Sequence, residues 1–110
     1  MNLNINIKEE TNQIYVFLSG EIDAYTAPKL KEAVLPLVDK NEPMIEVSLK
    51  DVEYMDSTGL GVFVGLLKSV RKQNGHLRLV DLSPRLQRLF SITGLSDIID
   101  ISPKSVGENQ

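Results

Sequence analysis

The first residues of the chain alternate between apolar and polar side chains. Leu3, Ile5 and Ile7 stand at every second position, with asparagine and lysine around them, which is the period of a strand that has one face in solvent. Residues 14–18 are apolar on both faces, as in a strand with neighbours on both sides. We therefore expect an edge strand at the start of the chain, paired as a hairpin with an inner strand over 14–18.

Apolar residues at helical spacing follow a turn that is predicted over 20–23. They indicate an amphipathic helix over 27–40. Thr26 is its expected N-cap, and Pro28 fits the first turn because the N–H that proline lacks would be unpaired there. Pro36 removes a backbone hydrogen bond inside the helix and kinks its axis, which leaves the last turn undefined.

The rest of the chain alternates strands with helices. Strands are predicted over 45–49, 77–80 and, marginally, 98–101. One helix begins after Asp56 and closes before Asn74, and another begins at Ser83 and ends near Gly94. The order strand, strand, helix, strand, helix, strand, helix, strand predicts an α/β fold with a mixed sheet of four to five strands and helices packed on it.

The length and composition are those of one globular unit. The chain has 110 residues, of which 42% are hydrophobic and 25% are charged, and this balance argues against disorder and fibrous repeats. We expect a single domain over 1–110, with its core at about 3–101 and a polar tail over 102–110.

Charge and cysteine content argue against several classes of function. The net charge of -3 gives no general attraction to nucleic acid or anionic lipid. The absence of cysteine removes disulfides, thiolate nucleophiles and cysteine-ligated metals. The longest strongly apolar uncharged run, 59–67, is far shorter than the roughly 20 residues of a membrane span, and the N-terminus has no secretory pattern. We expect a cytoplasmic protein with no direct nucleic-acid or membrane partner.

Few residues offer catalytic or ligand chemistry. His76 is the only histidine and is predicted to be solvated in a loop; no two ligands have metal-binding spacing, so neither metal nor cofactor is expected. The glycines of 59–65 superficially resemble a dinucleotide fingerprint, but their spacing is G-x-G-x-x-x-G and the last two fall inside the helix. Gly61 and Gly65 are four residues apart, and we interpret them as a face for close packing against the sheet or a neighbouring helix.

Asp56, Ser57, Thr58 and Gly59 form the most informative tetrapeptide. One interpretation is capping, in which a side-chain oxygen accepts a hydrogen bond from an N–H of the first helical turn. The other is a modification site, because Ser57 presents a hydroxyl just ahead of an apolar helix at the rim of the domain. A phosphoryl group there would add about 1.5 to 2 negative charges beside Asp56 and near a helix end, which can hold a phosphate. The residues alone leave both interpretations open.

Two stretches resemble a known family, and the resemblance covers about residues 3–101. They are Gly-Glu-Ile-Asp-Ala-Tyr-Thr-Ala-Pro at 20–28 and Asp-Val-Glu-Tyr-Met-Asp-Ser-Thr-Gly-Leu-Gly-Val-Phe at 51–63. Together with the order of elements, they resemble the bacterial anti-sigma factor antagonists, which are stand-alone members of the domain class called STAS that is shared with sulfate transporters. Those of the general stress response in Bacillus-type bacteria are the most similar. The resemblance implies a single STAS domain.

The resemblance also implies a partner-switching cycle. In that cycle the unphosphorylated antagonist binds an anti-sigma factor that is also a serine kinase, and the sigma factor is released for transcription. The kinase uses ATP to phosphorylate the antagonist, and a PP2C-type phosphatase restores it. The phosphoacceptor of the family maps onto Ser57, with Thr58 as a candidate secondary acceptor.

A docking surface for the kinase follows from the same resemblance. The loop that holds Asp23 and Tyr25 lies near the phosphoacceptor in the family fold and is expected to contribute. The expected partner-binding residues are Asp23, Tyr25, Asp56, Ser57, Thr58 and Gly59. The third helix, with Arg85 and Arg88, is a candidate extension of this surface.

Two other classes of function stay open. A nucleotide- or small-ligand-binding module would use the glycines of 59–65, although the phosphate-cradling motif G-x-x-x-x-G-K-[ST] is absent. A serine hydrolase would use Ser57 as nucleophile, but it needs a base and an oxyanion hole, and the turn predicted around His76 argues against a triad. We therefore expect a regulatory binding protein without catalysis of its own.

Overall fold

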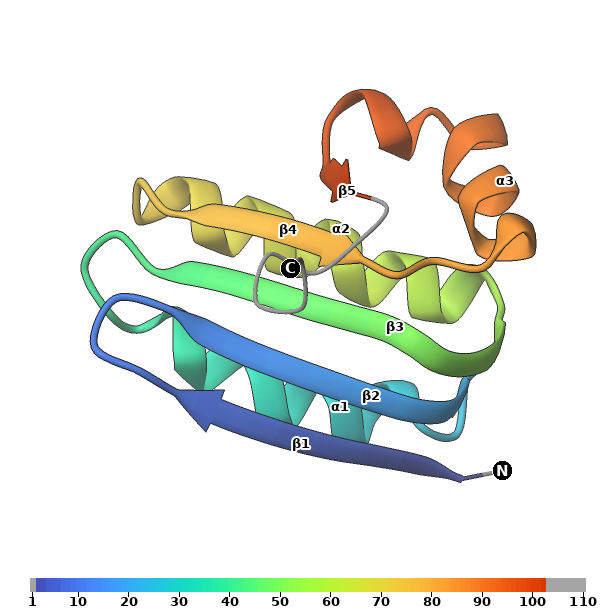
Figure 1. The fold of residues 1–110 in the computed structure, drawn as a ribbon, viewed down its shortest axis with the longest axis horizontal. Coiled ribbons are helices and arrows are strands. Elements are labelled where there is room, and N and C mark those ends of the chain that lie inside the picture. The colour runs from blue at the N-terminus through green and yellow to red at the C-terminus, as the bar shows by residue number, and fades with distance from the viewer. Residues whose placement is uncertain (1, 103–110) are drawn as a thin grey trace, which may run out of the picture.

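Five strands alternate with helices in the computed structural model, which describes residues 2–102 (Figure 1). The strands are β1 (Leu3–Glu9), β2 (Ile14–Ile22), β3 (Met44–Met55), β4 (His76–Val80) and β5 (Asp100–Ser102). The α-helices are α1 (Ala27–Val34), α2 (Ser57–Lys72) and α3 (Pro84–Ile92), and the 3-10 helices are η1 (Leu35–Val38) and η2 (Leu95–Asp97). The predicted α/β class and the predicted order of strands and α-helices are confirmed.

The strands form one mixed sheet in the order β1-β2-β3-β4-β5. β1 pairs antiparallel with β2, as the predicted hairpin requires, and lies at the edge. The pairs β2-β3, β3-β4 and β4-β5 are parallel. Because β2, β3 and β4 are each followed by an α-helix, the amino ends of α1, α2 and α3 lie at the same end of the sheet (Figure 1).

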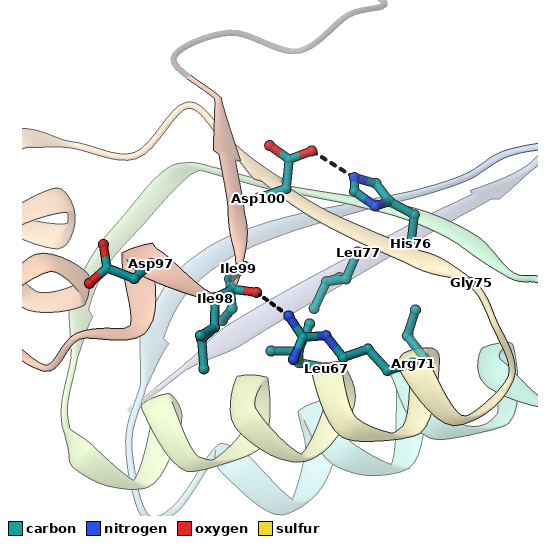
Figure 2. Close-up of a pocket in the computed structure, with 10 residues that line it drawn as sticks. Leu67, Arg71, Gly75, His76, Leu77, Asp97, Ile98, Ile99 and Asp100 are labelled. Atoms are coloured by element: carbon teal, nitrogen blue, oxygen red, sulfur yellow. Dashed lines mark hydrogen bonds and ion pairs between the residues drawn. The ribbon is translucent and has the colours of Figure 1, made fainter.

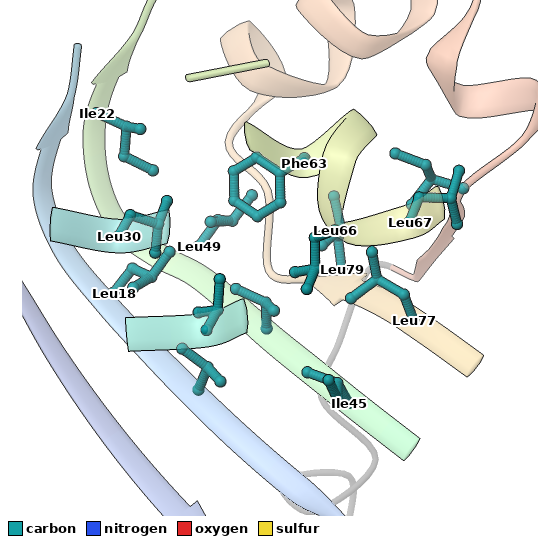
Figure 3. Close-up of a cluster of buried hydrophobic side chains, with 14 of the residues drawn as sticks. Leu18, Ile22, Leu30, Ile45, Leu49, Phe63, Leu66, Leu67, Leu77 and Leu79 are labelled. Carbon is teal, nitrogen blue, oxygen red and sulfur yellow. The ribbon is translucent and has the colours of Figure 1, made fainter. Parts of the chain in front are cut away.

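The core lies between the sheet and helices α1 and α2 (Figure 3). Alternate residues of the inner strands point into it, which is why Ile45 and Val47 are 1% or less exposed. Phe63 of α2 meets Phe90 of α3 edge to face, with ring centroids 6.2 Å apart, so α3 is attached to the same core. Between residues 2 and 102, no helix is both long and apolar enough to cross a membrane.

The turn predicted over 20–23 is wrong for its first three residues. β2 continues to Ile22, which is completely buried, and Gly20 takes a φ of +117° inside the strand. Two irregularities in the β2–β3 register accompany this extension, one of them between Gly20 and Glu21. Such bulges bend the strand without ending it. β3 is correspondingly longer than the predicted strand over 45–49.

The helix predicted over 27–40 also differs from the structure. α1 ends at Val34 and passes into the 3-10 helix η1, whose second residue is Pro36. Proline cannot donate the backbone hydrogen bond that an α-helix needs at this position, so the chain changes to the tighter helix. The irregular end of this helix is therefore due to Pro36, as the sequence predicts.

The third α-helix begins and ends close to the predicted residues. The Ser83 hydroxyl oxygen accepts a hydrogen bond from the Leu86 N–H at 3.2 Å, so Ser83 is the N-cap of this helix. The strand expected over 98–101 begins later, at Asp100. Ile98 and Ile99 instead donate their N–H groups to the Leu95 carbonyl in the turn after η2. Of the tail predicted over 102–110, Ser102 belongs to β5, and the rest lies outside the described residues.

Candidate functional site

The β2–α1 and β3–α2 connections meet at the carboxyl end of the parallel strands (Figure 1). In open α/β sheets this is the edge at which functional residues gather, because loops from neighbouring strands converge there. The topology therefore brings the loop around Tyr25 and the helix start at Ser57 to the same end of the molecule. Both belong to the stretches singled out in the sequence.

Asp56 is the N-cap of α2. Its carboxylate oxygen Oδ1 accepts hydrogen bonds from the N–H groups of Thr58, at 2.9 Å, and Gly59, at 3.2 Å. The capping interpretation is thus correct for Asp56. Since Asp56 supplies the cap, Ser57 and Thr58 do not need to, and both are exposed. The two interpretations of the tetrapeptide are therefore compatible: Asp56 caps the helix and the Ser57 hydroxyl is left accessible.

Asp23 holds the β2–α1 loop from beneath the surface. It is only 6% exposed, and its Oδ1 accepts hydrogen bonds from the N–H groups of Tyr25, at 2.9 Å, and Thr26, at 3.0 Å. The Thr26 hydroxyl accepts from the Asp23 N–H at 2.9 Å and donates to the Glu21 carbonyl at 2.8 Å. Tyr25, in contrast, is 85% exposed. The loop is a hydrogen-bonded unit that presents the tyrosine to solvent.

Thr26 does not cap α1 through its side chain, contrary to the sequence prediction. Its hydroxyl is occupied by the loop contacts with Asp23 and Glu21. Thr26 also has helical backbone angles instead of the extended ones that a capping side chain usually requires. Its role is to rigidify the loop that carries Tyr25.

The two connections are joined to each other through Ile22. The Asp56 N–H donates to the Ile22 carbonyl at 3.2 Å. A Cβ atom at Gly59 would lie 2.7 Å from side-chain atoms of Ile22 and of Met55 and 3.0 Å from the Ile22 carbonyl oxygen. Only glycine allows this approach, so Gly59 lets α2 sit directly on the end of β2. Tyr25 and Ser57 therefore share one rigid base.

The amino end of α2 has little capacity left for an anion. The four N–H groups that lack a partner within the helix are those of Asp56, Ser57, Thr58 and Gly59. Asp56 donates to Ile22, and Thr58 and Gly59 donate to the Asp56 carboxylate. Within residues 2–102 only the Ser57 N–H of these four has no partner. A phosphate on Ser57 would meet one free donor and an adjacent carboxylate, so it would remain on the surface.

His76 is exposed, as the sequence predicts, but it lies in a strand instead of a loop and is far from Ser57. It begins β4, opposite Met44 at the start of β3, whereas Ser57 follows the end of β3. Its Nε2 lies 2.6 Å from Oδ2 of Asp100 (Figure 2). The full length of β3 separates the histidine from the serine, so the geometry rules out a Ser57–His76 pair, and the hydrolase alternative has no base in this histidine.

Gly61 and Gly65 are not packing positions, which corrects the interpretation of their spacing. A Cβ atom at either residue would meet nothing within 4 Å. Both lie inside α2 and not in the turn between β3 and α2, where a phosphate-binding loop would place them. The described residues also hold no group of three histidine, aspartate or glutamate side chains that could bind a metal.

Comparisons with known proteins agree with this fold. The family model for the STAS domain matches residues 4–107. The chain is 57% identical over 107 residues to the anti-sigma-B factor antagonist of Bacillus subtilis, covering 97% of each chain. It is 57% identical over 102 residues to that of Listeria monocytogenes, covering 92% of this chain and 90% of the relative.

The fold of the chain is also similar to that of a solved anti-sigma factor antagonist. The crystal structure of an anti-sigma factor antagonist from Mycobacterium paratuberculosis superposes with a TM-score of 0.85 at 26% identity, covering 97% of this chain and 90% of the other. These relatives are named as antagonists of regulatory proteins and not as enzymes. The chain belongs to the STAS domain family and, within it, to the anti-sigma factor antagonists.

Proposed function

We propose that the chain, with Ser57 unphosphorylated, binds an anti-sigma factor that is also a serine kinase, and thereby releases a sigma factor for transcription in the cytoplasm. The kinase transfers the γ-phosphoryl group of ATP to the Ser57 hydroxyl oxygen, the proton leaves that oxygen, and ADP is released. The phosphorylated chain no longer binds. A PP2C-type phosphatase hydrolyses the phosphoester and returns the protein to the binding state.

The observation that carries this proposal is the position of Ser57. It is the first residue of α2, it is exposed, and its neighbours Asp56 and Thr58 are joined by the capping hydrogen bond. A kinase needs a hydroxyl that it can reach without unfolding its substrate. A fixed helix start at the end of the sheet meets that requirement.

The charge of the phosphate explains the loss of binding. Phosphoserine carries about −1.5 to −2 charges at neutral pH. The Asp56 carboxylate occupies two of the nearby N–H donors, so the phosphate is not neutralised by the helix end. A partner that covers Ser57 would have to remove water from this charge, and a loss of about 2.7 kcal/mol is enough to weaken binding a hundredfold.

We assign different tasks to the two residues of the β2–α1 loop. Tyr25 is the contact residue, because its side chain is 85% exposed and tyrosine is favoured at interfaces. Asp23 is a positioning residue, since its buried carboxylate holds the N–H groups of Tyr25 and Thr26. Thr58 is exposed next to Ser57 and stays the secondary acceptor.

The start of α3 extends the docking surface. Arg85 and Arg88 are both exposed, and Arg85 lies in the first turn of α3. α3 begins at the same end of the sheet as α1 and α2 (Figure 1). The two arginines would supply positive charge at the end of the sheet where Asp56 lies.

The direct test is a phosphorylation assay with the anti-sigma-B factor of Bacillus subtilis and Mg-ATP, followed by mass spectrometry. We expect one phosphoryl group, located on Ser57, in the wild-type chain. The Ser57→Ala chain should gain no phosphoryl group at position 57. The Ser57→Ala protein should still bind the kinase. Binding without phosphorylation, or a phosphoryl group only at another residue, would contradict the proposed cycle.

A further inference from the structure

A groove runs along the seam between α1 and α2, and among the described residues of its lining only Thr58 also belongs to the proposed docking surface. Its volume is about 530 Å³, within the range of protein binding pockets. Its lining is mostly apolar or small: Ala24, Ala27, Pro28, Lys31, Val34, Leu35, Thr58, Gly61, Val62, Gly65, Leu66 and Ser69. Thr58 and Ala24 line it at the end of the molecule where Ser57 and Tyr25 lie.

Two glycines of α2 line this groove, so no side chain projects into it from these positions. Gly61 and Gly65 are one helical turn apart and exposed, and a Cβ atom at either would meet nothing within 4 Å. Glycine is less favourable than alanine inside a helix, and the packing of this chain does not require it here. The glycines do allow another molecule to approach the α2 backbone more closely than any side chain would permit.

We infer that this groove receives an apolar, helical segment of the anti-sigma factor kinase, with an acidic residue facing Lys31. This inference rests on the proposed function and adds a second contact region to it. The first region, at Ser57 and Tyr25, carries the phosphorylation switch. The groove supplies apolar contact area that phosphorylation does not alter.

Continuity with the docking surface favours this occupant. Thr58 follows Ser57 in the chain and Ala24 precedes Tyr25, and both line the groove. A partner that covers Ser57 and Tyr25 therefore reaches the mouth of the groove without changing its orientation.

The walls of the groove indicate a helix as the occupant. Both walls are α-helices whose backbone groups are already hydrogen-bonded, so they offer no strand edge to which an extended segment could pair. Apolar side chains at helical spacing can instead enter between α1 and α2 above the glycines, as in other helix-in-groove complexes.

Lys31 gives the expected charge of the partner. Of the residues that the structure describes, it is the only charged one that lines this groove. Among residues 2–102 the structure gives its side chain no ion pair or hydrogen bond. A carboxylate on the incoming segment would complement it, and this pairing would fix the direction in which the segment lies.

The test fills the groove without touching the switch. In Gly61→Leu the new side chain projects into the open groove, whereas Lys68→Leu places the same side chain on an exposed α2 position outside it. Affinity for the anti-sigma-B factor of Bacillus subtilis is measured by calorimetry. We expect Gly61→Leu to weaken binding at least about tenfold, Gly61→Ala to have a smaller effect, and Lys68→Leu to stay within about twofold of wild type.

Further measurements separate the alternatives. The melting temperature of Gly61→Leu should not fall below that of wild type, and Gly65→Leu provides an independent filling variant. Lys31→Glu should weaken binding more than Lys68→Glu. Wild-type affinity of the folded Gly61→Leu and Gly65→Leu chains for the kinase would overturn the inference. A small molecule that native mass spectrometry finds on the wild-type chain but not on Gly61→Leu would also overturn it, if both chains bind the kinase equally well. Failure of the wild-type chain to bind would instead contradict the proposed function.

Discussion

Asp56 caps the helix and Ser57 presents an accessible hydroxyl, and the sequence alone could not tell which residue does which. Asp56 caps α2 through the N–H groups of Thr58 and Gly59, and this leaves the Ser57 hydroxyl free in solvent. Because Ser57 makes no capping hydrogen bond, its replacement should change binding and phosphorylation more than stability.

A first prediction concerns the charge at residue 57. Ser57→Asp should weaken kinase binding at least about tenfold, because the new carboxylate stands beside that of Asp56 and must lose water on docking. Ser57→Ala should bind within about threefold of wild type and unfold within about 0.5 kcal/mol of it. Calorimetric titration gives the affinities, and Ser57→Asn controls for side-chain size. Equal affinities for the Asp and Asn variants would show that charge is not the switch.

A second prediction concerns the cap. Asp56→Ala removes the acceptor of two N–H groups and should lower the free energy of unfolding by about 1 kcal/mol. Asp56→Ser keeps a capping oxygen and should recover most of that loss. Urea unfolding measures both. Equal stability of the alanine and serine variants would mean that the cap contributes nothing.

A third prediction compares two glycines of α2. Gly59→Ala should lower the free energy of unfolding by about 1–3 kcal/mol, because its Cβ would lie 2.7 Å from side-chain atoms of Ile22 and Met55. Gly61→Ala meets nothing within 4 Å and should raise stability by up to about 1 kcal/mol. The same urea experiment serves for both. A destabilising Gly61→Ala would show that its surroundings are not open.

At the scale of elements, the short strand β5 is held by basic side chains of its neighbours. Asp100 accepts from Arg78 Nε at 3.2 Å, and its Oδ2 lies 2.6 Å from His76 Nε2. Arg71 of α2 donates to the Ile98 carbonyl at 2.8 Å, just before the strand (Figure 2). β5 has only three residues, so these side-chain contacts supplement a small number of backbone hydrogen bonds.

A fourth prediction follows from the titration of Asp100. The hydrogen bond with His76 lowers the pKa of this carboxyl from its usual value of 3.8, and Arg78 lowers it further, while partial burial opposes both. A carboxyl with a lower pKa in the folded state stabilises the protein above pH 3.8, and this contribution is lost as the pH falls through the folded-state value. It is small, under about 1 kcal/mol, because the partners are partly exposed.

Asp100→Asn tests this at successive pH values. The difference in unfolding free energy between wild type and Asp100→Asn should be present at neutral pH and shrink in acid. Asp97→Asn removes a charge from the same segment and serves as the control, since the structure gives Asp97 no ion pair within residues 2–102. A difference that stays constant with pH would contradict the assignment.

Element types were predictable from periodicity, but several bounds were not. The alternation of Leu3, Ile5 and Ile7 and the proline in the first long helix report on local structure. The extension of β2 to Ile22 depends on pairing with β3 across bulges, and such pairing is not encoded in a local pattern. The late start of β5 likewise depends on the turn that follows Gly94.

At the scale of the whole molecule, topology explains how much of the site was predictable. The helix start at Ser57 follows from the cap pattern, and the parallel order of strands brings Tyr25 to the same end. The burial of Asp23 could not be seen, because an aspartate in a polar loop has the same pattern whether it contacts a partner or its own backbone. The pairing of His76 with Asp100 joins residues 24 positions apart, and the groove beside Gly61 exists only once α1 packs next to α2.

The segments at the carboxyl end of the parallel strands form one rigid surface for a partner. The β2–α1 loop, the start of α2 and the start of α3 stand on one sheet and share the core beneath them. In the proposed cycle, phosphorylation of Ser57 would therefore change the surface charge without moving the fold, and we expect the switch to act on binding and not on conformation.

The most direct measurement is the affinity of the anti-sigma-B factor of Bacillus subtilis for the chain in two forms, unmodified and stoichiometrically phosphorylated on Ser57. Phosphorylation is predicted to weaken the complex about a hundredfold, with unchanged far-ultraviolet circular dichroism. Equal affinity of the two forms would contradict the central claim that charge at Ser57 controls docking.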